Sequence, residues 1–158
     1  MPSWSRFDPP DLSLQGLLYS VSFEGTIGSG QSSYSQVKTG ALKTTVTHFG
    51  LVSVSENMRF TVLEAPTITN GTTQVAAINV NRNSANTALT AFYTNPTSIS
   101  GGTTILVVGF PSGSNKVGGI VDNEFVWTCL PNTSYVVKID NLGNSTSSVF
   151  FNMGFYEH

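Results

Sequence analysis

Residues 148–158, SVFFNMGFYEH, alternate between two sets of side chains with a period of two. Successive side chains of a β-strand point to opposite faces of its sheet, so this alternation predicts a strand with one face in a hydrophobic core. The face assigned to the core consists of Val149, Phe151, Met153 and Phe155. The opposite face consists of Phe150, Asn152, Gly154 and Tyr156. Chain ends commonly fray unless they are held, so we expect this strand to be paired in the centre of a sheet.

The segment before it, SYVVKID (residues 134–140), shows the same alternation, and the loop NLGNSTS between the two has the length and glycine content of a hairpin loop. Earlier, ALKTTVTHFG (41–50) also alternates. Strict period two would place Val46 and His48 on one face of that strand and Thr47 and Phe49 on the other.

Further apolar runs, separated by Gly, Asn, Ser and Pro clusters, complete an all-β pattern. They are GLLYSVSFEG, MRFTVLE, QVAAINV, LTAFYT, TILVVGF and EFVWTCL. About eight to ten strands are too many for one open sheet, so we expect an antiparallel two-sheet sandwich. The Gly/Ser-rich stretches around 24–36 and 110–119 look like long crossing loops, which favours a jelly-roll-like connection over a meander.

The chain divides into two parts. Residues 1–16 contain Pro2, Pro9 and Pro10 beside Trp4 and Phe7, and we expect them to form an extended N-terminal arm that docks either on its own domain or on a neighbouring subunit. Residues 17–158 form the β-sandwich domain, which is large enough to bury a core of its own.

Charge is scarce in this sequence. Only 10% of the 158 residues are charged, whereas Ser, Thr and Asn supply 52, so the surface is coated with neutral polar groups. The net charge is −2 and the seven Lys and Arg are scattered, so no basic patch for nucleic acid is expected. No apolar run is long enough for a membrane helix, and the first residues lack the apolar centre of a signal peptide. We therefore expect a soluble protein made in a cytoplasm.

Residues that could carry chemistry are few. Cys129 is the single cysteine, so no internal disulfide is possible, and its apolar surroundings indicate a small buried side chain. His48 lies inside a predicted strand, where a half-buried structural role is expected. No phosphate-binding motif is present. We expect no enzyme activity, no cofactor and no metal.

Two groups of oxygen ligands leave an alternative open. Asp122 and Glu124 would share a strand face and could bind a divalent cation or flank a glycosidic bond, although a solvated turn edge explains them as well. Asp140 with Asn141 and Asn144 resembles a calcium-binding cluster, and turn formation explains it equally well.

Two longer segments are familiar in combination. INVNRNSANTALTAFYTNPTSISGGTTI (residues 78–105) has an N-x-N-R-x-S element, an aromatic strand, an N-P-T turn and a G-G-T strand start. EFVWTCLPNTSYVVKIDNLGNSTSSVFFNMGFYEH (124–158) has a Leu-Pro-Asn-Thr turn, a strand opening with Tyr and a closing aromatic strand that ends Tyr-Glu. In this order the motifs resemble the head decoration, or capsid cement, proteins of tailed bacteriophages, over the second half of the chain.

The resemblance implies a function. Such a protein would be made in the host cytoplasm, bind the major capsid protein on the outside of the virion and stabilise the shell without catalysis. It would be a homo-oligomer, with a trimer favoured, and neither nucleic acid nor membrane would be a partner. Trp4, Arg6 and Phe7 of the arm and Arg82 between two asparagines would be candidate contacts with the capsid or a sister subunit.

Two other functions remain open. One is a host-recognition or carbohydrate-binding module of a phage fibre, which would require exposed aromatic rings on a concave face. Trp127 lies in an apolar strand and is expected in the core, which leaves few rings for that purpose. The other is a small glycan-degrading enzyme that uses Asp122 and Glu124.

Overall fold

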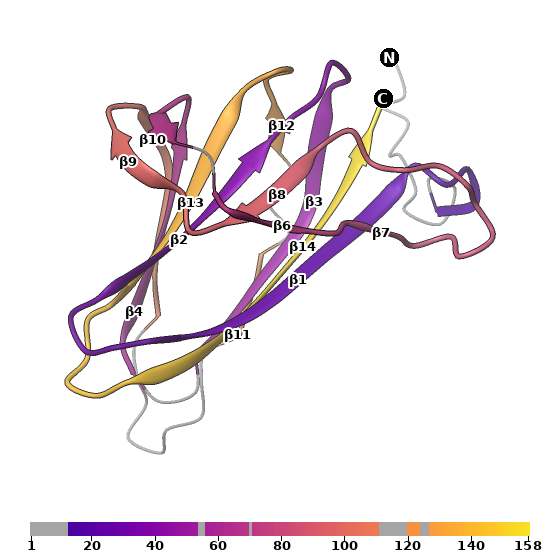
Figure 1. The fold of residues 1–158 in the computed structure, drawn as a ribbon. Coiled ribbons are helices and arrows are strands. Elements are labelled where there is room, and N and C mark those ends of the chain that lie inside the picture. The colour runs from indigo at the N-terminus through magenta and orange to yellow at the C-terminus, as the bar shows by residue number, and fades with distance from the viewer. Residues whose placement is uncertain (1–12, 54–55, 70, 111–119, 124–126) are drawn as a thin grey trace, which may run out of the picture.

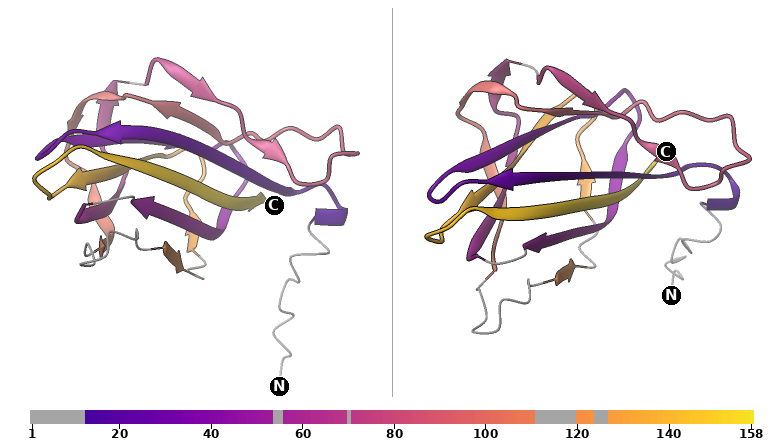
Figure 2. Two further views of the ribbon diagram at one scale, coloured as in Figure 1. Left: turned by 90° about the horizontal axis from the view of Figure 1, so that it is seen from below. Right: turned by 60° about the horizontal axis from the view of Figure 1, so that its bottom comes forward.

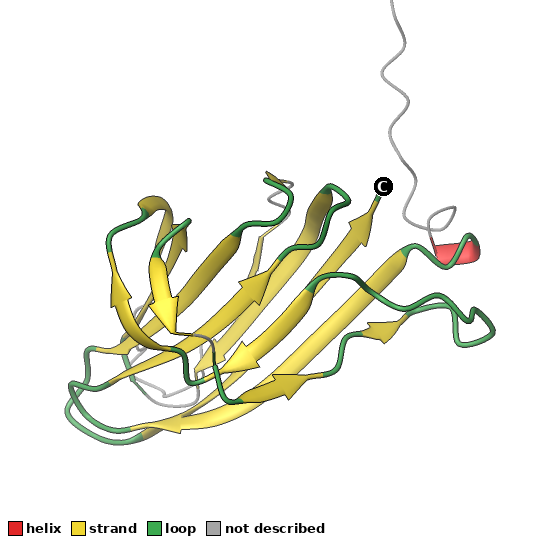
Figure 3. Ribbon diagram, turned by 45° about the horizontal axis from the view of Figure 1, so that its top comes forward, coloured by secondary structure: helices red, strands yellow, loops and turns green. Residues whose placement is uncertain are grey.

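The structure is a computed structural model that describes residues 13–53, 56–69, 71–110, 120–123 and 127–158. The described residues contain fourteen β-strands and a helical turn at residues 13–14 (Figures 1 and 3). Most strands belong to two antiparallel six-stranded sheets, which confirms the expected all-β, two-sheet sandwich.

The first sheet, sheet A, has β14 at its centre, as predicted for the end of the chain. β14 (Ser147–Glu157) lies between β1 (Leu18–Ile27) and β3 (Thr44–Ser53) and pairs with β1 over ten positions. β7 (Ile78–Asn79) forms the edge beside β1, and β11 (Ile120–Asn123) and β12 (Trp127–Cys129) both pair with β3.

The second sheet, sheet B, has the order β10-β4-β13-β2-β8-β6. Its strands are β10 (Thr103–Phe110), β4 (Met58–Glu64), β13 (Ser134–Asn141), β2 (Ser32–Lys38), β8 (Ala91–Thr94) and β6 (Thr73–Val75). The short strands β5 (Thr67–Thr69) and β9 (Thr97–Ser100) pair with each other in a small separate sheet.

The connections are those of a jelly roll. Strands β1, β3 and β14 belong to sheet A. Strands β2, β4 and β13 belong to sheet B, and each is adjacent in sequence to one of the three sheet A strands. The four-strand block β12-β3-β14-β1 thus faces the block β10-β4-β13-β2 across the sandwich (Figure 2). Two packed four-stranded blocks with this nested order define the double Greek-key arrangement.

Aromatic rings fill the space between the sheets. The whole predicted core face of β14 is buried, and Phe155 is fully inaccessible. Phe155 stacks on Tyr19 of β1 with ring centroids 5.5 Å apart, and Phe49 of β3 stacks on Phe60 of β4 at 5.1 Å. The Phe49–Phe60 pair connects sheet A to sheet B, whereas Tyr19 and Phe155 are neighbours within sheet A. Burial of each ring removes a large apolar area from water and stabilises the core.

One predicted alternation is wrong. Val46 and Phe49 were expected on opposite faces of β3, yet both are buried in the core, at 1% and 0% exposure. The pairing of β3 with β14 shifts between Gly154, opposite His48, and Phe155, opposite Val46. Thr47 is therefore an extra residue in β3, and such a β-bulge reverses the side-chain alternation beyond it.

Three further predictions also change. The stretch around 24–36 is not one long loop, because β1 continues to Ile27 and β2 begins at Ser32. The sequence QVAAINV (residues 74–80) is not one strand, because β6 belongs to sheet B and β7 to sheet A. Residues 13–16 of the expected arm form a turn, closed by a hydrogen bond from the Gly16 amide to the Ser13 carbonyl, and do not continue extended.

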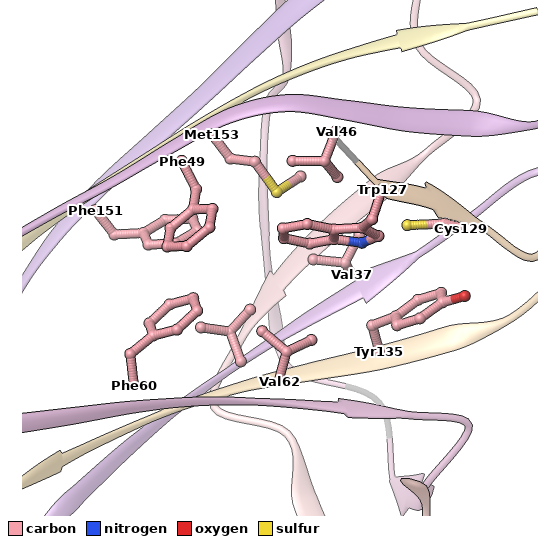
Figure 4. A pocket seen from close by; sticks show the side chains of 11 residues that line it. Val37, Val46, Phe49, Phe60, Val62, Trp127, Cys129, Tyr135, Phe151 and Met153 are labelled. Carbon is pink, nitrogen blue, oxygen red and sulfur yellow. The ribbon is translucent and has the colours of Figure 1, made fainter. Parts of the chain in front are cut away.

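The centre of the core holds a small apolar cavity of about 10 Å³ (Figure 4). Trp127 lies against it, edge-on to Phe49 at 5.7 Å, so the indole belongs to the core as predicted. A void of this size holds at most one water molecule. It is not a ligand site.

Candidate interaction surfaces

The outer face of sheet A is open over its central strands. Ser22 and Glu24 of β1 point outward and lie opposite Asn152 and Phe150 of β14. All four side chains are exposed, and Phe150 keeps 44% of its surface accessible. They line a shallow hollow of about 380 Å³. We call this hollow the β1–β14 hollow.

A polar pair adjoins the hollow on the same face. Nε2 of His48 lies 3.0 Å from Oδ1 of Asn152, across the β3–β14 pairing. Gly50 lies directly opposite Asn152, and a Cβ there would come within 2.6 Å of the same Oδ1 atom. The absence of a side chain at position 50 therefore leaves room for Asn152. His48 is partly buried in its strand, as expected.

The other end of this face carries an apolar patch. The Val80 amide donates to the Leu18 carbonyl at 2.9 Å, and Ile78 lies opposite Ser20. Tyr19, which follows Leu18, and Asn79, which lies between Ile78 and Val80, are buried. Because side chains alternate along a strand, Leu18, Ile78 and Val80 point to the outer side. The Leu14 carbonyl accepts a hydrogen bond from Nδ2 of Asn81 at 3.1 Å.

These four residues, Leu14, Leu18, Ile78 and Val80, are the apolar patch. Three of them are strongly exposed, at 77% for Leu14, 47% for Ile78 and 43% for Val80. Single exposed apolar residues are ordinary, but a contiguous group on one face indicates a contact surface.

The outer face of sheet B is covered by the chain itself over its central strands β2 and β13. Gln36 of β2 and Val136 of β13 are paired with each other and point away from the core, yet both are fully buried. The amide of Gly71, from the connection that follows β5, donates to Oε1 of Gln36 at 3.1 Å. Nε2 of Gln36 donates to the Ser134 hydroxyl at 3.3 Å. A buried amide side chain with both ends bonded fixes this covering segment.

Farther along sheet B, Asp140 holds an ionic cluster. Its carboxylate lies 2.9 Å from Nη2 of Arg59 and 2.8 Å from Nζ of Lys138, and it accepts the Ser32 hydroxyl at 2.5 Å. Burial by itself raises the pKa of Asp140, but the hydrogen bonds from Lys138, Ser32 and Arg59 outweigh burial and hold the pKa below its ordinary value.

The calcium hypothesis for this loop finds no support in these contacts. The Asp140 carboxylate already has two cationic partners. Oδ1 of Asn141 accepts the Gly143 amide at 2.9 Å, and its Nδ2 donates to the Ile27 and Ser145 carbonyls. These are the contacts of an Asx turn. No cluster of three or more His, Cys, Asp or Glu occurs in the part of the chain that the structure describes.

The other candidate groups are partly visible. Asp122 lies in β11 opposite Gly50, whereas Glu124 lies outside the described residues. The Cys129 thiol is buried as predicted, and burial raises its pKa to about 11, so little reactive thiolate forms at neutral pH. Burial also raises the pKa of Tyr135, whose hydroxyl donates to Glu64 at 3.0 Å and accepts the Leu130 amide at 2.7 Å.

The contact residues expected from the resemblance are only partly described. Arg82 is exposed in a turn, where the Ser84 amide donates to the Asn81 carbonyl and the Asn83 amide to the Asn81 side chain. Trp4, Arg6 and Phe7 lie outside the described residues. Arg82 follows the apolar patch directly in sequence, two residues after Val80.

Sequence reasoning missed the apolar patch and the covered face. A signal for the patch was present in INV (residues 78–80), where two apolar residues flank Asn79, but the run looked like part of a longer core strand. Gln36 gave no signal, because its burial depends on a segment that returns from more than thirty residues away.

No protein-family model matches the chain, and no curated protein matches it. Among solved structures, the crystal structure of Yersinia pseudotuberculosis-derived mitogen (YPM) is similar over 85% of this chain and 83% of that one, at 14% sequence identity and a TM-score of 0.42. A likeness of this size carries no functional information. Within the described residues, no helix is long and apolar enough to cross a membrane.

Proposed function

We propose that this chain is a non-enzymatic structural protein that binds the outside of a tailed-phage icosahedral capsid and stabilises it as a decoration or cement protein. The motifs of residues 78–105 and 124–158 support the proposal, since they resemble that family. The structural observation that carries it is the contrast between the outer faces of the two sheets. Sheet B is covered by its own chain over β2 and β13, whereas sheet A presents a sparsely charged open face with exposed apolar side chains at Ile78, Val80 and Phe150.

A neutral face of this kind suits attachment to a packed shell. The face has few charges to desolvate, and exposed apolar side chains gain free energy when a partner covers them. A protein that binds the assembled shell and not its dissociated subunits stabilises the shell by mass action. Many copies on one particle multiply that effect, even where each interface is modest.

The proposal is tested with particles that carry or lack this protein. Particles without it are expected to break at a lower temperature and to regain their resistance when purified protein is added back. A variant with Phe150→Ser and Ile78→Ser should fold normally, bind shells at least about tenfold more weakly and fail to restore resistance. A matched control, Val107→Ser on the outer side of edge strand β10, should restore it. Equal heat resistance with and without the protein would contradict a cement function.

A second candidate function is carbohydrate recognition on a phage fibre. The β1–β14 hollow favours it, because the Phe150 ring lies beside Glu24, Ser22 and Asn152, and an aromatic ring beside hydrogen-bonding groups can bind a sugar. Against it, the described aromatic platform is a single phenylalanine.

The same particles separate the two functions. Loss of adsorption to host cells with unchanged heat resistance would support recognition, and so would a Phe150→Ser variant that loses glycan binding while still binding shells. Loss of heat resistance with normal adsorption supports capsid decoration.

A further inference from the structure

We infer that the apolar patch is the docking site for residues 1–12 of a second copy of this chain, so that the protein self-associates by exchange of N-terminal segments. The patch consists of Leu18, Ile78 and Val80 on the outer side of the β1–β7 edge, together with the exposed Leu14, whose carbonyl is bonded to Asn81. The inference does not depend on capsid binding, because its test uses the isolated protein.

The position of the patch points to the N-terminal segment as its occupant. The described chain begins at residue 13, and Leu14, the second described residue, is the most exposed large apolar residue reported for the structure, at 77%. The described chain therefore begins beside the patch, and residues 1–12 are joined to it there. They contain Trp4 and Phe7, apolar rings that gain free energy from burial against such a surface.

The spacing of the prolines selects a second copy over the same chain. Pro9 and Pro10 separate the aromatic residues from Ser13 and favour extended conformations at residues 8–10. At about 3.1 Å per residue, an extended spacer carries Phe7 about 19 Å from residue 13. The residues Ile78 and Val80 are only about 7 Å apart along their strand. An arm extended in this way would carry its rings beyond its own patch, which is why we assign them to the patch of a second copy.

The area and charge of the contact agree with this occupant. Phe and Trp each bury about 150–250 Å², so two reciprocal arms and the two patches that they cover bury on the order of 1,200 Å², the lower end of the range for specific dimers. The arm has Arg6, Asp8 and Asp11, and Arg82 lies exposed two residues after Val80. An exposed arginine at the rim of the patch complements the two aspartates of an incoming arm.

The first experiment measures association of the isolated full-length chain by sedimentation velocity over a range of concentrations. The patch variant Ile78→Ser with Val80→Ser and the arm variant Trp4→Ser with Phe7→Ser should each weaken association at least about tenfold. The matched control Val107→Ser, a substitution of a similarly exposed valine on sheet B, should not. Circular dichroism and the melting temperature establish that each variant is folded.

Complementation then distinguishes exchange from other contacts. The patch variant still has an intact arm, and the arm variant still has an intact patch, so a 1:1 mixture should form a heterodimer although neither variant associates alone. In a Trp127→Phe background Trp4 is the single tryptophan, and its shielding from iodide quenching should increase with protein concentration.

Four results would overturn the inference. The first is a monomer at all concentrations up to about 100 μM, and the second is association that survives the patch substitutions. The third is Trp4 shielding that does not depend on protein concentration, which would place the arm on its own chain. The fourth is Trp4 shielding that occurs only when capsid shells are added.

Discussion

The two sheets of this molecule differ on their outer faces. On sheet B the chain returns over its own surface, buries Gln36 and Val136 completely and fixes the covering segment through the Gly71 amide. On sheet A nothing described covers Phe150, Asn152 or Ile78. A jelly roll needs only the inner faces of its sheets for its core, so cover on one outer face is an addition that consolidates the domain. Under the proposed function, the uncovered face is the one that contacts a partner.

The largest expected change in stability comes from comparing one substitution on each side of β14. Phe155→Ala removes a ring with no exposure from the core and should destabilise the domain by about 3–5 kcal/mol. Phe150→Ala, five residues earlier on the open side, should change stability by less than about 1 kcal/mol. Urea unfolding followed by circular dichroism measures both. Similar losses from the two substitutions would show that the outer side of β14 is packed as well.

A second pair compares the outer faces directly. Val136→Ala on the covered face of sheet B should cost about 2 kcal/mol, because a fully buried valine loses apolar contacts and leaves a gap. Val80→Ala on the open face of sheet A should cost less than about 0.5 kcal/mol. Thermal unfolding in the same buffer provides the comparison. If Val80→Ala destabilised the domain as much as Val136→Ala, the outer face of sheet A would be covered in solution.

The ionic cluster on sheet B predicts a dependence on pH. The folded-state pKa of Asp140 lies below its ordinary value, so the carboxylate stabilises the fold at pH values above that ordinary value, near 4. This contribution is lost as pH falls through the lower, folded-state pKa. Asp140→Asn should therefore cost about 1–3 kcal/mol at pH 7 and progressively less in acid.

The matched control for this prediction is Glu24→Gln, on the exposed outer face of sheet A, which should leave stability nearly unchanged. The measurement is the free energy of unfolding between pH 7 and pH 3 for the wild type and both variants. An Asp140→Asn curve parallel to that of the wild type at every pH would contradict the assignment.

The smallest effect concerns Cys129. Its thiol is buried between the sheets and its pKa is raised to about 11, so folded protein should react with an aromatic disulfide reagent orders of magnitude more slowly than unfolded protein. Rapid labelling of the folded chain would show that the core opens near β12.

Much of the inner face could be predicted from the sequence, because period-two alternation reports burial on one side. β14 follows that rule from Ser147 to Phe155, and its core residues were identified correctly. β3 departs from it where Thr47 bulges, and the bulge depends on pairing with residues about a hundred positions away. β2 is rich in serine and its Gln36 is polar, so only tertiary pairing with β13 shows that it is a strand.

The candidate surfaces could be predicted far less well. Ile78 lies on an outer face because it pairs with Ser20, nearly sixty residues away, and no local pattern contains that information. Phe150 was correctly placed opposite the core, but its exposure depends on whether another segment covers sheet A, as one covers sheet B. Inner faces follow from local alternation, whereas outer faces depend on the path of the whole chain.

The most direct test of the central claim is thiol labelling at one position on the open face of sheet A and at one position on the separate β5–β9 sheet. Ser22→Cys lies on the open face of sheet A, and Ser100→Cys lies at the exposed end of β9, beside sheet B. The buried Cys129 contributes little background. On binding to capsid shells that lack this protein, labelling at position 22 is expected to slow at least about tenfold while labelling at position 100 is unchanged. Protection at position 100 with free reaction at position 22 would contradict the claim that the open face of sheet A contacts the partner.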